Sequence, residues 1–294
     1  MFLHCGRHQL DLTTPMVMGI LNVTPDSFSD GGHFTGFNAA IDHAMSMIEA
    51  GAGCIDVGGE STRPGAAAVT ASEEIDRVVP VIEALATLSG VPISLDTSKA
   101  EVIRAGARAG ASMINDVRAL REPGALEAAA ATQAAICLMH MQGQPRTMQH
   151  DPRYDDVVRE VGEFLQARID ACELAGIARE RLILDPGIGF GKRLEHNLQL
   201  LASLPQLLEL GRPLLIGVSR KSMFGALLGR AVDQRLAGGL AAATAATLAG
   251  ASMLRVHDVA ATVDAVKLAV ALQERGYTML QRGPAPDSTT RPAP

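Results

Sequence analysis

The sequence predicts an α/β fold, a single-domain (β/α)8 barrel of the TIM type. Short β-rich runs alternate with longer helical stretches from Met16 toward the C-terminus, and eight such repeats can be followed. Eight parallel strands joined by helices are the number that closes into a barrel. The length agrees, because the chain has 294 residues and such a barrel commonly needs about 250. An open, doubly wound sheet is the structural alternative.

The expected strands are short apolar runs bounded by polar or glycine-rich segments. They span residues 17–21, 54–57, 93–95, 113–114, 135–139, 182–184, 214–218 and 253–256. The helical stretches between them include residues 38–50, 72–88, 99–109, 154–174 and 236–249. No linker divides residues 1–280, which are predicted to form one domain. Residues 281–294 are rich in Pro, Ser and Thr and are expected to be a disordered tail.

Composition indicates a globular protein with one large core, since 47% of the residues are hydrophobic and 20% are charged. The net charge of −6, without long runs of one sign, argues against nucleic acid as a partner, because that surface would be basic. Between Arg235 and Arg255 there is no charge, but this stretch is mostly Ala, Gly and Thr. A membrane span would favour Leu, Ile and Phe, so we expect a buried helix followed by a barrel strand.

The N-terminal residues contain no apolar signal segment, and the four cysteines form no CxxC pair. We therefore expect a cytoplasmic protein with reduced thiols and no membrane partner. The Ala- and Gly-rich helix at 236–249 could pack closely against a second copy, which leaves a homodimer open.

Each expected strand finishes on a polar or charged residue. In an α/β barrel the active site forms at the C-terminal ends of the strands, so these side chains predict one site assembled from the whole mouth. Any single one could instead cap a helix or bind loop amides, but capping does not explain Asn, Lys, Arg and His at the same relative position. The residues are Asn22, Asp56, Asp96, Asn115 with Asp116, His140, Asp185, Ser219 with Lys221, and Arg255 with His257.

Arg255 and His257 predict a phosphate site. Residues two apart on a strand point the same way, so both side chains could reach one oxyanion. Barrel closure brings this last strand beside the first, which ends at Asn22. An amide oxygen next to a phosphate can serve as a Mg²⁺ ligand, since Mg²⁺ takes few protein ligands and keeps waters and phosphates. A surface arginine beside a capping histidine is the alternative.

The run Gly187-x-Gly189-x-Gly191 lacks the GxGxxG spacing of a dinucleotide-binding motif, so no NAD is assigned.

Eight motifs resemble, in family order, those of the dihydropteroate synthases. The first two are long and specific: MGILNVTPDSFSDGG at residues 18–32 and DVGGESTRPG at residues 56–65. The others are LDT at 95–97, IND at 114–116, HMQG at 140–143, DPGIGFG at 185–191, GVSRKS at 217–222 and RVHD at 255–258. The resemblance covers about residues 16–272. The flanks differ at Ile188 and at residues 66–68, but no matched polar position is lost.

The resemblance implies that a pterin pyrophosphate is joined to 4-aminobenzoate in folate biosynthesis, with Mg²⁺ as cofactor and sulfonamides as inhibitors. The pterin pocket would be Asp96, Asn115, Asp185 and Lys221, and the pyrophosphate site Asn22, Arg255 and His257, with Asn22 as the metal ligand. Positions around 4-aminobenzoate are matched by Thr62, Arg63, Pro64, Phe190, Ser219 and Lys221. A mobile lid is matched by Asp26, Phe28 and Asp30. The implied catalytic residues are Asp96, Asp30, Lys221 and Arg255.

The implied roles agree with the chemistry of the side chains. A carboxylate such as Asp185 can accept two adjacent N–H groups of a pterin, and Asn115 offers both a donor and an acceptor. Departure of pyrophosphate leaves a cationic CH2 group, which Asp96 and the lid residue Asp30 would stabilise. Arg255, His257 and Mg²⁺ would stabilise the leaving group.

Three other readings of these motifs are open. A methyltetrahydrofolate–corrinoid methyltransferase would share the pterin pocket, but it has no use for a pyrophosphate site. A Schiff-base aldolase built on Lys221 would leave the ESTRP loop at 60–64 without a role. The non-enzyme alternative is a degenerate barrel that binds pterin or acts as a scaffold. Loss of one of the named polar groups would have favoured it, and none is missing.

Overall fold

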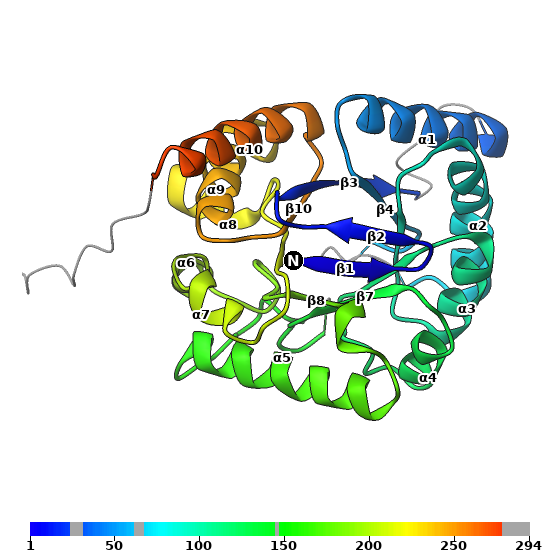
Figure 1. The fold of residues 1–294 in the computed structure, drawn as a ribbon, viewed down its shortest axis with the longest axis horizontal. Helices are drawn as coiled ribbons and strands as arrows, with labels where there is room; N and C mark the ends of the chain where they lie inside the picture. Colours follow the sequence, from blue (N-terminus) through cyan, green and yellow to red (C-terminus); the bar gives the residue numbers. More distant parts are fainter. Residues whose placement is uncertain (24–31, 62–67, 145–146, 278–294) are drawn as a thin grey trace, which may run out of the picture.

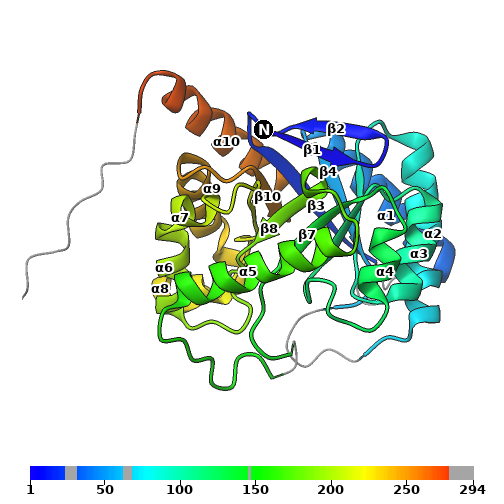
Figure 2. The same cartoon turned by 60° about the horizontal axis from the view of Figure 1, so that its bottom comes forward.

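A computed structural model confirms the barrel (Figures 1 and 2), and it describes residues 1–23, 32–61, 68–144 and 147–277. Eight parallel strands are hydrogen-bonded in the order β8-β7-β6-β5-β4-β3-β10-β9. A bridge between Leu184 and Leu214 brings β9 back to β8. The sheet therefore curls round on itself, which excludes the open doubly wound alternative.

The barrel strands lie at the expected places, and several run one residue further into the mouth. They are β3 (Met16–Asn22), β4 (Cys54–Gly58), β5 (Ile93–Asp96), β6 (Met113–Asp116), β7 (Ala135–Met139), β8 (Leu182–Asp185), β9 (Leu215–Ile216) and β10 (Met253–Val256). Only β9 is shorter than expected, because Leu214 makes an isolated bridge and the ladder to β10 has two residue pairs.

Helices surround the strands on the outside (Figure 1). They are α1 (Gly32–Glu49), α2 (Ala71–Leu88), α3 (Ala100–Ala109), α4 (Ala125–Ala130), α5 (Val157–Leu174), α6 (Leu194–Ala202), α7 (Leu204–Leu208), α8 (Ser222–Leu228), α9 (Leu236–Leu248) and α10 (Val259–Glu274). The expected start of α5 at residue 154 is wrong by three residues. Asp156 caps this helix, since its carboxylate accepts from the amides of Val158 and Arg159.

A hairpin that was not expected closes the N-terminal end of the barrel. Strands β1 (Phe2–Cys5) and β2 (His8–Asp11) pair antiparallel and lie across the near end of the barrel in Figure 1. Leu3 and Cys5 are fully buried and pack against the side chains inside the barrel, among them Met113 and Met253. The first residues of the chain thus form the floor of the barrel, opposite the mouth.

The uncharged stretch between Arg235 and Arg255 is α9 followed by β10, as expected. The expected burial of the helix is wrong, however, because only Ala243, Ala246 and Thr247 are buried in it. Alanine and glycine are small enough to pack on the barrel from one face while the other face stays at the surface. No helix among the residues described by the structure is long and apolar enough to cross a membrane.

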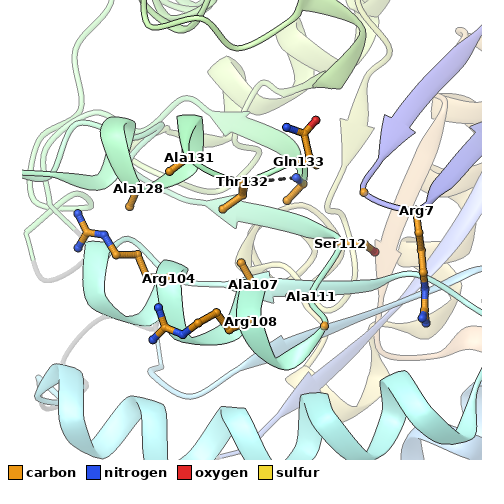
Figure 3. Close-up of a pocket in the computed structure, with 13 residues that line it drawn as sticks. Arg7, Arg104, Ala107, Arg108, Ala111, Ser112, Ala128, Ala131, Thr132 and Gln133 are labelled. Carbon is orange, nitrogen blue, oxygen red and sulfur yellow. Dashed lines mark hydrogen bonds between the residues drawn. The ribbon is translucent and has the colours of Figure 1, made fainter.

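A groove of about 750 Å³ lies at the floor end of the barrel (Figure 3). Arg104 and Arg108 of α3 line one side, and Thr132 and Gln133, which precede β7, line the other. These segments lead into the N-terminal ends of β6 and β7. The groove therefore contains none of the polar residues at the strand ends.

Candidate active site

The alternation of side chains along each strand decides which residues reach the barrel interior. On β4, Ile55 and Val57 pack outward in the core shared with the helices, whereas Cys54 belongs to the cluster inside the barrel. Asp56 shares the inward phase with Cys54. The same alternation turns four more residues inward at the mouth: Asn115, Asp185 and Arg255 each lie two positions after an interior residue, and Asp96 follows the outward Leu95.

Arg255 ties these residues together by bridging two carboxylates across the mouth. Its Nε donates to Oδ2 of Asp56 at 2.6 Å, and its terminal nitrogen donates to Oδ2 of Asp96 at 2.7 Å. Asn115 donates from Nδ2 to the same Oδ2 of Asp56 at 3.0 Å. Asp56 is fully buried whereas Arg255 is 20% exposed, so the ion pairs lie at the bottom of the mouth and one side of the guanidinium faces its opening.

The network leaves two buried acceptors unused. Oδ1 of Asp56 and Oδ1 of Asn115 have no hydrogen-bond partner among the described residues. A buried acceptor without a donor costs free energy, typically about 1–3 kcal/mol, and a ligand that carries N–H groups would remove that cost. The two atoms therefore indicate a binding site for a donor-bearing polar ring.

Burial shifts the pKa values of two carboxyls at the mouth, Asp96 and Asp185. Burial raises the pKa of Asp96 to about 7, although the Arg255 guanidinium opposes the shift. Burial also raises the pKa of Asp185, against the hydrogen bond from the Gly187 amide and the charge of Lys221. For Arg255, burial works to lower the pKa, but the carboxylates of Asp56 and Asp96 outweigh it and hold the guanidinium charged. Carboxyls with raised pKa values in one concave site are typical of catalytic centres.

Lys221 and Phe190 meet on another side of the mouth. The Nζ atom of Lys221 lies 4.2 Å from the centre of the Phe190 ring, a distance typical of a cation–π contact. Burial lowers the pKa of Lys221 to about 8, against the charge of Asp185. Phe190 also packs with an apolar group formed by Val117, Met139, Met141 and Met148. A flat ring could lie between this apolar wall and the polar residues.

Ser219 contacts His257. Its Oγ atom accepts from the His257 amide at 3.2 Å and lies 3.0 Å from Nδ1 of the imidazole. The next residue, Arg220, forms a two-point ion pair with Asp258, which joins the segment after β9 to the segment after β10. The structure thus places Ser219 beside a residue expected at the pyrophosphate.

Asn22 ends β3, where it is paired in register with Gly58, and Gly58 is paired with Asp96. Asn22 therefore lies on the rim of the mouth, and it shares the inward phase of Met18. Six expected site residues lie outside the residues that the structure describes: Asp26, Phe28, Asp30, Thr62, Arg63 and Pro64.

Two of the polar strand-end residues have structural roles. Asp116 follows the inward Asn115 and points the other way, where it accepts from the amides of Arg118 and Leu120 and from the Ser98 hydroxyl. Asp116 therefore binds loop amides, which is the alternative that its sequence position left open. His140 is buried, and its Nδ1 atom lies within hydrogen-bond distance of the Lys192 amino group, at 2.9 Å.

Sequence reasoning placed Asp56 among the polar strand ends of the mouth but assigned it to no ligand, and it did not mention Lys192. The alternation Cys54, Asp56 on β4 was the available signal for Asp56, since it puts the carboxylate inside the barrel. Lys192 directly follows the glycine run 187–191, but nothing in the sequence indicates that its side chain turns inward.

The chain matches the family model described as "Pterin binding enzyme" over residues 18–257. It is 58% identical over 259 residues to the dihydropteroate synthase of Escherichia coli K12, a match that covers 88% of this chain and 92% of that protein.

Solved structures agree with this match. A Yersinia pestis dihydropteroate synthase in complex with a sulfonamide drug is 56% identical, with a TM-score of 0.89 over 93% of this chain and 100% of that one. A Xanthomonas albilineans dihydropteroate synthase in complex with 7,8-dihydropteroate is 52% identical, with a TM-score of 0.85 over 93% of this chain and 99% of that one. The family match runs from within β3 to the residue after β10, and so it includes every barrel strand.

Proposed function

This chain belongs to the dihydropteroate synthase family of pterin-binding enzymes, and we infer on that basis that it is a transferase of folate biosynthesis. It condenses 6-hydroxymethyl-7,8-dihydropterin pyrophosphate with 4-aminobenzoate to give 7,8-dihydropteroate and pyrophosphate. The observation that carries the assignment is the cluster at the mouth, where Arg255 bridges Asp56 and Asp96 beside the buried amide of Asn115.

The pterin is proposed to bind with its amino-pyrimidinone edge toward Asp185, Asn115 and Asp56. Asp185 would accept two adjacent N–H groups of the ring. The unused oxygens of Asn115 and Asp56 would accept others, which would satisfy the atoms that the protein leaves without donors. The apolar group around Met139 and Phe190 would cover the faces of the ring.

The transfer itself breaks the bond between the pterin CH2 carbon and the pyrophosphate oxygen, and it forms a bond from that carbon to the arylamine nitrogen. Positive charge develops on the pterin CH2 as pyrophosphate leaves, and Asp96 in its anionic form would stabilise it, together with Asp30. Arg255 and His257 would bind the departing pyrophosphate. The attacking amine needs no strong base, because an aniline is already unprotonated at neutral pH, and it loses its proton after attack. Lys221, above Phe190, would orient the 4-aminobenzoate.

Mg²⁺ is proposed as the cofactor, and the donors present fit it. No group of three or more His, Cys, Asp or Glu side chains is placed to hold a metal within the described parts of the chain. A single amide oxygen from Asn22 on the rim suits Mg²⁺, which commonly keeps waters and takes phosphate oxygens as ligands. When bound, Mg²⁺ would neutralise charge on the pyrophosphate.

The assignment is tested by measuring pyrophosphate release from the pterin pyrophosphate with and without 4-aminobenzoate. We expect release that depends on 4-aminobenzoate, with one 7,8-dihydropteroate formed per pyrophosphate. Equal release in both reactions would mean hydrolysis and would contradict the synthase assignment.

Removal of Mg²⁺ should abolish turnover and leave binding of the pterin alcohol intact, because only the pyrophosphate needs the metal. In Asn22→Ala, the Mg²⁺ concentration that gives half-maximal rate should rise, since one ligand is lost. Rates at a series of Mg²⁺ concentrations after chelation measure both effects. An unchanged Mg²⁺ requirement in Asn22→Ala would remove Asn22 from the metal site.

Sulfonamides should inhibit by competing with 4-aminobenzoate, because they are also para-substituted anilines. A sulfonamide substituent that projects beyond the substrate volume should contact Phe28 and Pro64, so Pro64→Ser should raise the drug Ki more than the substrate KM. Initial rates at several concentrations of both compounds measure this. Inhibition that 4-aminobenzoate cannot relieve would refute the shared site.

We also propose a cytoplasmic homodimer. The outer face of α9 is exposed, and Leu236 at its start is 44% exposed beside Val232 at 58%. Small apolar residues on an uncovered helix let a second copy approach closely. Sedimentation of the purified protein tests this, and a monomer at micromolar concentration would contradict it.

A further inference from the structure

Lys192 lies directly after the glycine run 187–191, and its amino group is buried between two loops. The residue is 3% exposed. Its Nζ atom donates to the carbonyl oxygens of Gly187 and Phe190, both at 3.0 Å, and lies 2.9 Å from Nδ1 of His140. The carbonyl oxygen of His140 lies further away, at 3.4 Å. An ammonium group has three hydrogens, so the three close acceptors are enough to satisfy it.

Nδ1 of His140 can accept a hydrogen bond from Lys192 only if the imidazole is neutral. Burial, followed by the charges of Lys192 and Arg121, lowers the pKa of His140 to about 2. Nδ1 can therefore accept, with the ring hydrogen on Nε2. Burial also lowers the pKa of Lys192 to about 7 against the charge of Asp185, while the three acceptors favour the ammonium form. The buried amino group of Lys192 is therefore held by neutral acceptors.

The two loops joined by Lys192 touch through their main chains. A Cβ atom on Gly187 would lie 1.9 Å from the carbonyl oxygen of His140, and one on Gly191 would lie 2.3 Å from that of Gln142. No side chain fits at either position. The Tyr154 hydroxyl donates to the Gly191 carbonyl oxygen at 2.9 Å. The loop after β8 is thus held against the loop after β7, with the amino group of Lys192 at the junction.

The loop after β8 contacts side chains that the proposed function assigns to both substrates. The Gly187 amide donates to Oδ1 of Asp185 at 2.7 Å and so fixes that carboxylate. Phe190 lies under the amino group of Lys221. At Gly189, a Cβ atom would lie 3.1 Å from Cδ of Lys221. A small displacement of this loop would therefore move Asp185, Phe190 and Lys221 relative to one another.

We propose that Lys192 is a positioning residue for the transfer reaction: its buried amino group joins the loops after β7 and β8 and so holds Asp185 and Phe190 where the two substrates bind. This rests on the proposed function, which gives Asp185 and Phe190 their roles. Lys192 does not itself touch a substrate, because its three hydrogens are used within the protein. Displacement of Asp185 and Phe190 would weaken the contacts that they make with the two substrates.

The test compares Lys192→Met with a matched control, Arg181→Met. Arg181 is also a buried cation that binds main-chain carbonyls, since it donates to those of Ala134 and Ala129, but it precedes β8 at the floor of the barrel. Both variants should lose thermal stability. We expect only Lys192→Met to raise the KM for the arylamine substrate and the Kd for the pterin alcohol, each by ~10-fold, which is the scale of one weakened hydrogen bond, with a smaller change in kcat.

Unchanged KM and Kd values in Lys192→Met, with only Tm lowered, would overturn the proposal, as would equal changes in both variants. If Lys192→Met does not fold, His140→Ala removes one of the three acceptors, and it should raise the same two constants to a smaller extent; unchanged constants there would also overturn it. The Kd for the pterin alcohol is measured by calorimetry without turnover. Failure of the synthase assignment would instead appear as wild-type protein that forms no 7,8-dihydropteroate.

Discussion

Replacing Asp96 with Asn should lower kcat by ~10²-fold or more, the scale of losing one preorganised electrostatic group at a charged transition state. Asn keeps the shape of the side chain and can still accept from Arg255, but it carries no negative charge to stabilise the pterin CH2 cation. Single-turnover rates at saturating substrates measure the chemical step.

The matched control is Asp116→Asn, because Asp116 is also a buried strand-end aspartate but faces away from the mouth. It should lower Tm and leave kcat of the folded protein unchanged. Near-normal kcat in folded Asp96→Asn would mean that Asp96 does not stabilise the cation and only orients Arg255.

The pH dependence follows from the same carboxyl. Burial raises the pKa of Asp96 to about 7, so the group is protonated below that pH and anionic above it. If the anion is the active form, kcat/KM should rise with pH through about 7 and fall as pH drops. Ionisation of the pyrophosphate also affects the pH profile of kcat/KM. The increase of kcat/KM near pH 7 should therefore be absent in Asp96→Asn, whereas any pH dependence that comes from the substrate should remain.

Replacing Arg255 with Ala should have two large effects. It leaves Asp56 and Asp96 as buried carboxylates without their cation, and breaking such a pair typically costs about 3–5 kcal/mol. It also removes a proposed phosphate ligand, so affinity for the pterin pyrophosphate should fall far more than affinity for the pterin alcohol. Calorimetry with Mg²⁺ compares the two ligands, and Tm at pH 6 and pH 8 measures the stability. The loss of Tm should be smaller at pH 6, where protonation of Asp96 relieves the unpaired charge.

Arg220→Ala is the control for Arg255, since the ion pair of Arg220 with Asp258 is near the same rim but Arg220 is 47% exposed. Exposed pairs contribute about 0–1 kcal/mol, so its Tm should change little. Equal loss of affinity for both pterin ligands in Arg255→Ala would move this residue away from the phosphates and leave it a role in the pterin pocket alone.

The sequence predicted the barrel strands closely because each is an apolar run that ends at a polar residue. It did not predict the N-terminal hairpin, since half of its side chains, such as His4 and Gln9, face solvent and interrupt the apolar pattern. Short helices such as α4 and α8 have too few turns to show a helical period. Local composition cannot reveal an element whose burial depends on distant parts of the chain.

For the site, strand-end position predicted that Asp96, Asn115, Asp185 and Arg255 lie at the mouth, but it wrongly included Asp116. It did not predict how the residues pair. Arg255 on β10 contacts Asp56 on β4, a residue 199 positions away whose strand is separated from β10 by β3. This partnership depends on barrel curvature, which strand alternation does not specify. The expected role of Arg255 at the pyrophosphate stays a prediction, and in the structure its guanidinium forms ion pairs with Asp56 and Asp96.

The placement of the cysteines makes the protein suited to chemical labelling. All four are buried and form no disulfide, and burial raises the pKa of each thiol, to about 11 for Cys5 and Cys172 and well above the usual thiol range for Cys54 and Cys137. Because the thiolate is the reactive form, the folded protein presents no native thiol to alkylating reagents near neutral pH. A single cysteine introduced at the rim would therefore carry a fluorophore or spin label selectively, without removal of any native cysteine from the barrel interior.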